Sequence, residues 1–191
     1  MIFAIKDKET VYLASTFTPI SGCIGKEDKA LPENAAIFNI PGSDAFLAIE
    51  KSTVPFVDKL RFTPLFEGTD GKLTASNLIN HVKPRIVELA TEYDIYQKGC
   101  FYCNLIFVQG DKIITMNGNG CLADVNDYIV FGNGEDSATG SLAITSELPA
   151  EDRIIRAVHA VRDNDHAIYY PITIVDTAAD EGTVISEGAY E

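Results

Sequence analysis

The chain has 191 residues, of which 46% are hydrophobic and 23% are charged, which is ordinary for a folded protein with a real core. Its formal net charge is −13, which argues against nucleic acid and anionic membranes as partners, because both are bound by clustered Lys and Arg. No apolar run approaches the roughly 20 residues that cross a bilayer, and the short apolar start is followed at once by charged residues, so we expect a cytoplasmic protein without a signal peptide.

The first quarter of the chain predicts strands that are separated by polar turns. Apolar residues alternate over 2–5 and 11–15 around a charged turn, which predicts an N-terminal β-hairpin. Residues 17–33 combine glycines, prolines and polar side chains and predict a loop with a short strand in it. The apolar run 35–40 predicts a buried strand. A Pro-Gly-Ser-Asp turn follows, and its cap residues predict a helix over 45–51.

The middle of the chain predicts one long helix and then a hairpin. Apolar residues recur every three or four positions over 74–93, where Pro84 should kink or break the helix because it lacks the N–H of a helical hydrogen bond. Two β-rich runs, 100–108 and 112–117, are joined by Gln-Gly-Asp and predict a hairpin. Residues 118–126 predict a polar loop.

The last third has the most specific order of elements. Residues 128–131 predict a buried strand, and the Gly-Asn-Gly turn 132–134 ends it. Acidic residues after that turn favour a helix start, because negative charge meets the positive end of the helix dipole. Pro149 ends this helix, and a second one is predicted from Ala150. Residues 167–175 are rich in Ile, Tyr and Val and predict a final strand.

The cysteines do not predict a metal centre. Cys100 and Cys103 have the C-x-x-C spacing of zinc and redox sites, but they lie in a predicted strand, where residues three apart point to opposite faces. No second C-x-x-C pair and no histidine at ligand spacing accompanies them. We therefore expect reduced, structural cysteines and neither a metal nor a cofactor.

Five segments, taken in order, carry a resemblance to a known family. They are the hairpin 2–14, the strand and small-residue turn 36–46, the strand and Gly-Asn-Gly turn 127–134, the long helix 148–162 and the strand after it, 163–177. Together they resemble the proteasome subunit family, in particular the bacterial proteasome-like peptidase that partners a ring ATPase. The resemblance implies one proteasome-subunit-like domain over 1–191, folded as a four-layer αββα sandwich. It also implies a homo-oligomer, ring-shaped in that family, with an ATPase as a candidate partner.

The same resemblance implies a catalytic site that this chain lacks in several places. The family uses a hydroxyl or thiol on its first residue as nucleophile, with the free α-amine as base. Here Met1 occupies that position, and the family's acid falls at or beside the uncharged Thr16. The family's lysine corresponds to Lys26 or Lys29, and the serine of its G-S-G turn is Asn133. Thr16, Lys29 and Asn133 are therefore the candidate cleft residues of a non-catalytic member.

Two alternatives stay open at this point. The first is an active peptidase or amidohydrolase, in which cleavage at a Gly-Cys junction exposes a thiol, or Thr16 or Ser15 acts as nucleophile with Lys29. The Gly-Cys junctions precede Cys23, Cys100 and Cys121. The second is a binding module for a small molecule or peptide, which keeps the cleft between Thr16, Lys29 and the turn 40–43 without turnover.

Overall fold

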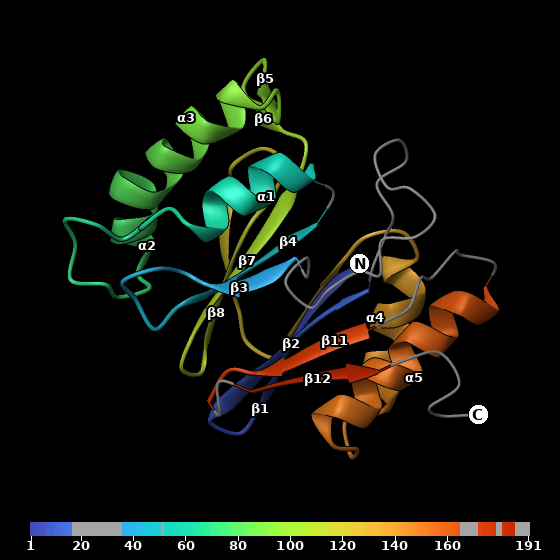
Figure 1. Cartoon of the computed structure of the whole chain (residues 1–191). Helices are drawn as coiled ribbons and strands as arrows, with labels where there is room; N and C mark the ends of the chain where they lie inside the picture. Colours follow the sequence, from blue (N-terminus) through green and yellow to red (C-terminus); the bar gives the residue numbers. More distant parts are fainter. Residues whose placement is uncertain (17–35, 51, 165–171, 179–180, 186–191) are drawn as a thin grey trace. The chain divides into compact units, whose positions relative to one another are not determined.

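The protein forms two compact units (Figure 1). The computed structural model describes residues 1–16, 36–50, 52–164, 172–178 and 181–185, the last of these without their side chains. Unit 1 combines the two ends of the chain, Met1–Ala35 and Asp127–Glu191, and unit 2 is the intervening segment Ala36–Asn126. The described helices include none that is long and apolar enough to span a bilayer.

Unit 1 is built on an antiparallel sheet with the strand order β10-β1-β2-β11-β12. Its strands are β1 (Ile2–Asp7), β2 (Thr10–Thr16), β10 (Tyr128–Phe131), β11 (Ile172–Asp176) and β12 (Glu181–Ile185). The β1–β2 pair confirms the predicted hairpin, with Ile2 opposite Ser15. On its other side β1 pairs with β10, so that Ile2 also lies opposite Phe131. Segments more than a hundred positions apart in the sequence thus meet at the start of β1.

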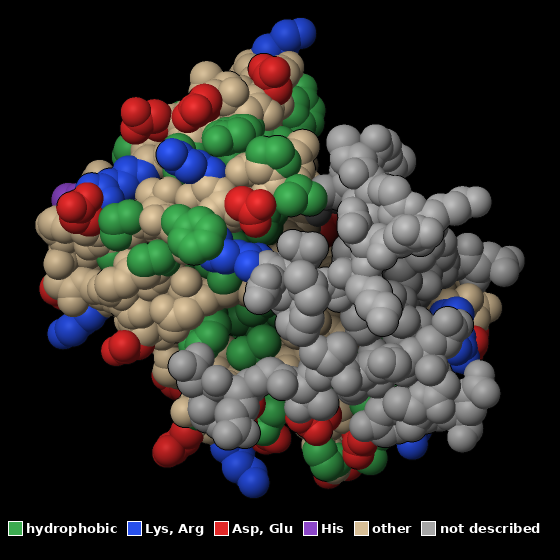
Figure 2. Space-filling model, viewed as in Figure 1, with side chains coloured by type: hydrophobic (Ala, Val, Ile, Leu, Met, Phe, Trp, Pro, Cys, Tyr) green, Lys and Arg blue, Asp and Glu red, His purple; other side chains and the backbone are tan. Residues whose placement is uncertain are grey.

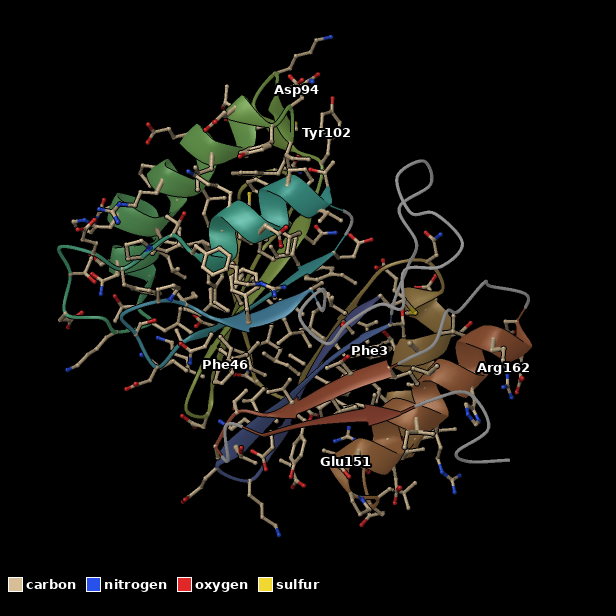
Figure 3. The ribbon with its side chains drawn as sticks, in the orientation of Figure 1. Phe3, Phe46, Asp94, Tyr102, Glu151 and Arg162 are labelled. Atoms are coloured by element: carbon tan, nitrogen blue, oxygen red, sulfur yellow. The ribbon has the colours of Figure 1, made fainter. Side chains whose placement is uncertain are left out.

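Two helices cover one face of this sheet, α4 (Glu135–Ile144) and α5 (Ala150–Asp163) (Figure 1). Phe3 and Ile5 of β1 and Ala14 of β2 point to that face and join one apolar cluster with Leu142 and Val158 of the helices. Phe3 is marked in Figure 3, where Glu151 and Arg162 mark the two ends of α5. Both helices carry two acidic residues in the first turn, as the sequence predicts from the helix dipole.

Unit 2 has its own sheet, with the strand order β3-β4-β7-β8-β9. Its strands are β3 (Ile37–Asn39), β4 (Phe46–Glu50), β7 (Asn104–Gln109), β8 (Lys112–Met116) and β9 (Leu122–Val125), and a separate hairpin joins β5 (Tyr96–Gln97) to β6 (Cys100–Phe101). The helices are α1 (Val54–Arg61), α2 (Ala75–Asn77) and α3 (Lys83–Glu92). In Figure 1 α1 and α3 lie on one side of this sheet. Phe56 and Ile86 of these helices pack with Leu47 and Phe107 of the strands in one buried cluster.

The helix predicted over 45–51 is wrong, because Phe46–Glu50 forms strand β4. Gly42, with φ 76°, allows the tight turn before it, and the Ile40 N–H donates to the Ala45 carbonyl at 2.7 Å, so the chain folds back on itself. All five residues of β4 are buried, and β4 lies between β3 and β7. A central strand with two buried faces has a continuous apolar run, which periodicity cannot separate from a helix.

The break predicted at Pro84 takes the form of a widened helical turn. Residues 78–82 form a π-helical turn between α2 and α3, and the Lys83 N–H donates to the Leu78 carbonyl five residues earlier. Pro84 has no N–H and cannot continue the regular ladder, so the wider turn takes up the mismatch.

Two strand predictions and one loop prediction also need correction. The run 100–108 is not one strand, because it is split by Tyr102 and Cys103 into β6 and β7. Residues 122–125 form strand β9, where a polar loop was expected, because edge strands tolerate polar and exposed side chains. The strand 128–131 exists, but only Val130 in it is buried. It borders the described sheet next to β1, which accounts for this partial burial.

Charged side chains of both signs are mixed on one face of the described residues (Figure 2). On the face drawn in Figure 2, Asp and Glu side chains alternate with Lys and Arg side chains across the described residues. Such mixing is typical of a solvated surface rather than of a steering patch.

Candidate functional site

The start of β1 is buried and is hydrogen-bonded to the end of β2. Met1 is 9% exposed and Thr16 is 6% exposed. The Met1 α-amine donates to the Thr16 Oγ1 at 3.0 Å, and the Thr16 backbone N–H donates to the Met1 carbonyl at 3.0 Å. The antiparallel register of the hairpin brings these two residues together, because it continues the pairing of Ile2 with Ser15.

The turn between β10 and α4 forms the second wall of this site. A Cβ added to Gly132 would lie 2.9 Å from the Met1 Cα and 2.9 Å from its Cγ, so that only glycine leaves room for Met1. Gly132 and Gly134 have φ values of 131° and 82°, which side chains disfavour. The Glu135 N–H donates to the Gly132 carbonyl at 3.2 Å and closes the turn onto the first residue of α4.

The structure brings together some of the residues that the sequence singled out. Met1 and Thr16 are in contact, and Asn133 lies in the turn whose Gly132 meets Met1, with its own side chain exposed. Lys29, like Lys26 and Cys23, falls outside the described residues. The turn 40–43 belongs to unit 2.

Comparisons with known proteins give the fold. No protein-family model and no curated protein matches the sequence. Among solved structures, BPH from Thiobacillus denitrificans aligns with a TM-score of 0.69 and 16% identity over 97% of this chain and 98% of its own. Anbu (ancestral beta-subunit) from Yersinia bercovieri aligns with a TM-score of 0.67 and 11% identity, over 98% of this chain and 87% of its own. Eukaryotic HslV from Trypanosoma brucei aligns with a TM-score of 0.56 and 14% identity, over 92% of this chain and 98% of its own. The chain has a proteasome-type fold.

Sequence reasoning missed one residue of this site, Gly132. The sequence predicted that the Gly-Asn-Gly turn ends a strand and that its Asn133 belongs to the cleft, but it did not predict the close approach of Gly132 to Met1. The available signal was the pair of glycines on either side of Asn133, since a glycine beside a buried strand end often marks a close backbone approach. Nothing in the local sequence says which distant residue makes that approach.

The chemistry that this arrangement can perform depends on which groups carry a mobile proton. The Met1 side chain is a thioether, which is a weak acceptor and has no proton to lose. The Met1 amine donates a hydrogen bond to the Thr16 hydroxyl oxygen. The neighbouring Ser15 is also buried. Positions 15 and 16, where the resemblance places the family's acid, carry Ser and Thr and no carboxylate.

The three described cysteines have different environments. Cys103 is buried, whereas Cys100 and Cys121 are exposed. The described residues contain no group of three His, Cys, Asp or Glu side chains that could hold a metal ion. Burial raises the pKa of the Cys103 thiol from 9.0 to about 12, and the nearby Glu50 adds to the shift.

We predict that Cys103 makes the protein less stable at alkaline pH. The folded thiol keeps its proton up to a pKa of about 12, whereas the unfolded thiol loses it near 9.0. Unfolding therefore releases a proton in this window, so stability is unaffected below pH 9 and falls as pH rises above it, by at most about 1.4 kcal/mol per unit. Urea titrations of the wild type and Cys103→Ala between pH 8 and 11 measure this, because only the difference in slope belongs to Cys103. Parallel slopes would contradict the prediction.

Proposed function

We propose that this chain is a self-assembling, proteasome-like subunit that does not perform N-terminal-nucleophile hydrolysis and serves a structural or binding role. The observation that carries the proposal is the identity of the residue at the start of β1. Met1 fills the place between Thr16 and Gly132, and its thioether cannot act as the hydroxyl or thiol nucleophile that the reaction needs.

Two further observations support a loss of the reaction while the cleft is kept. Thr16 accepts a hydrogen bond from the amine but brings no charge to it. Asn133 is exposed in the turn beside the site and offers an amide in place of a hydroxyl. We propose Thr16, Lys29 and Asn133 as the polar residues that line this cleft and contact whatever ligand it holds.

The apolar faces of both sheets support a single four-layer αββα domain over 1–191. In unit 1 the helices cover one face, and the other face of the hairpin carries Ile2, Ala4, Val11 and Leu13, all buried. In unit 2 the face away from the helices carries Ile37, Phe46, Ala48, Ile106, Val108 and Ile113, also buried. Two sheets that are apolar on both faces fit an architecture in which each is covered on both sides.

We further propose a cytoplasmic homo-oligomeric ring, with a ring ATPase as its candidate partner.

The test combines three measurements on one purified sample. BPH of T. denitrificans has been solved in complex with epoxomicin, which makes epoxomicin a suitable probe. We expect native mass spectrometry to show Met1 retained and no epoxomicin bound, and light scattering to show an oligomer. An epoxomicin complex, or loss of residues 1–22, would overturn the inactive assignment. A monomer would overturn self-assembly and leave the small-molecule or peptide binding module.

One observation favours a second candidate, an active hydrolase that uses Thr16. The distance of 3.0 Å between the Met1 amine and the Thr16 Oγ1 is within the range over which a neutral amine can take the proton of a hydroxyl nucleophile. In that case the Thr16 oxygen attacks an amide carbonyl and the amine acts as base. The burial of Thr16 opposes this candidate, because a nucleophile must reach its substrate.

Two variants at position 16 separate the candidates and give a stability prediction. Thr16→Val removes the hydroxyl that accepts from the buried Met1 amine and keeps the shape, so the loss of this one hydrogen bond should cost about 1–2 kcal/mol of unfolding free energy. Thr16→Ser keeps a hydroxyl and should cost less. Urea denaturation measures both, alongside hydrolysis of a fluorogenic peptide panel. Under our proposal neither variant nor the wild type hydrolyses the peptides. Hydrolysis that is lost in Thr16→Val and kept in Thr16→Ser would establish the alternative.

A further inference from the structure

The chain contains three Asn-Gly dipeptides, at positions 117–118, 119–120 and 133–134. Asn-Gly is the dipeptide most open to intramolecular cyclisation, because glycine places no side chain in the path of its own nitrogen as it approaches the Asn amide carbon. Cyclisation requires that this glycine nitrogen be free to move and that the Asn side chain not be held elsewhere. Tertiary structure therefore decides which of three chemically identical dipeptides reacts.

The first two dipeptides are held in unit 2 by hydrogen bonds on the reacting groups themselves. The Gly118 N–H donates to the Asn104 Oδ1 at 3.2 Å. The Gly120 N–H donates to the Asn117 carbonyl at 2.7 Å. The Asn117 Oδ1 accepts from the Asn119 N–H at 3.0 Å, so that side chain is fixed as well. Both attacking nitrogens must break a hydrogen bond before they can react.

The third dipeptide, in the turn between β10 and α4, has neither restraint. Asn133 is exposed, and within the described part of the chain neither its side chain nor the Gly134 N–H makes a hydrogen bond. Gly134 has φ 82° and precedes the first residue of α4, so its nitrogen lies outside the helical ladder. The two groups that must meet are therefore two groups for which the described residues supply no hydrogen bond.

We propose that Asn133–Gly134 is a site of spontaneous covalent modification, at which Asn133 deamidates faster than Asn117 and Asn119. The Gly134 nitrogen attacks the Asn133 side-chain carbonyl carbon, forming an N–C bond, and the side-chain nitrogen leaves as ammonia after taking up the Gly134 proton. Water then opens the resulting succinimide at either carbonyl. The product is an aspartate at 133 or an isoaspartate, in which the main chain runs through the former side chain.

The modification would change the site at the start of β1. It adds one negative charge beside Glu135 and Asp136, which already occupy the first turn of α4. The isoaspartate product also lengthens the main chain directly after Gly132, whose backbone is in close contact with Met1. This inference is independent of the proposed function, because it needs only the geometry of the turn.

The test is an ageing experiment on the full chain. Samples are kept at mildly alkaline pH and 37 °C, in buffer and in concentrated urea, and peptide mapping by mass spectrometry follows the mass gain of amide-to-carboxyl conversion at each position. Since a hydrogen bond on the attacking nitrogen costs about one factor of ten in reactivity, we expect Asn133 to react about tenfold faster than Asn117 and Asn119 in buffer. In urea the three rates should converge.

Two outcomes would overturn the proposal: an Asn133 peptide that stays unmodified while the chain is folded, or one that reacts no faster than the two peptides of unit 2. Asn133→Gln is the matched control, because its longer side chain would have to form a larger and slower ring. It should remove the fast phase and leave the circular dichroism spectrum unchanged. Asn104→Ala supplies the converse control, since it frees the Gly118 N–H and should accelerate Asn117 alone.

Discussion

Gly132→Ala is expected to destabilise the protein by about 3 kcal/mol, because it combines overpacking with backbone strain. The added Cβ would lie 2.9 Å from the Met1 Cα, which is backbone and cannot rotate away. The φ of 131° at this position is one that residues with side chains rarely adopt. Relief would require the β10–α4 turn to move away from the start of β1, which would also open the candidate site. Urea unfolding followed by circular dichroism measures the loss.

Gly140→Ala is the matched control for this prediction. Gly140 lies within α4, a few residues along the chain, and a Cβ there meets no atom within 4 Å. Because alanine restricts the unfolded chain and favours the helix, we expect this variant to gain about 0.5–1 kcal/mol. The same chemical change should therefore have opposite signs at two nearby positions. A Gly132→Ala protein as stable as the wild type would show that Met1 does not occupy the place described here.

Arg153→Ala is expected to cost about 3 kcal/mol, because it removes a buried side chain that joins three elements of unit 1. Arg153 is 5% exposed, and its Nη2 donates to the Leu142 carbonyl in the last turns of α4 at 3.3 Å. Its guanidinium carbon lies 5.6 Å from the centre of the Tyr128 ring in β10. The ion pair with Asp127 spans 3.9 Å, and Asp127 is largely exposed, so it contributes little.

Arg156→Ala is the control on the same helix. Arg156 is exposed, and truncation there should change the unfolding free energy by less than about 0.5 kcal/mol. Arg153→Met separates packing from hydrogen bonding, because methionine keeps an apolar stem of similar length. We expect the unfolding free energy of Arg153→Met to lie between those of the wild type and Arg153→Ala. Equal losses of unfolding free energy in Arg153→Ala and Arg156→Ala would show that the contacts of the buried Arg153 guanidinium do not stabilise unit 1.

The elements that sequence patterns predicted well are those whose signals are local. The β1–β2 hairpin, the helix over 150–163 and the hairpin around Gly110 each carry their period and their turn within a short window. The prediction for strand β4 was wrong because both of its faces are buried, so that its residues lack the alternation of apolar and polar side chains that distinguishes a strand. Strand β9 (Leu122–Val125) was missed because it has only four residues and none of them is buried. Both are defined by their neighbours in the sheet rather than by their own residues.

The candidate site divides in the same way. Its hairpin half, Met1 and Thr16, follows from register, because the pairing of two adjacent strands with a short turn can be counted along the sequence. The other half of the site cannot be predicted from strand register. The contact of Gly132 with Met1 joins residues at opposite ends of the chain, and no local pattern encodes such a pairing.

The sequence by itself determined the order of most elements, the uncharged Thr16 at the end of β2 and the absence of a nucleophilic side chain at Met1. These features depend on residue types and short-range periodicity, which can be read directly from the sequence. Only the tertiary structure decided that β10 lies beside β1, that glycine is required at 132 and that Arg153 is buried. It also distinguishes three identical Asn-Gly dipeptides by the hydrogen bonds on their glycine nitrogens. The physical reason is that burial and contact depend on which distant strands pair.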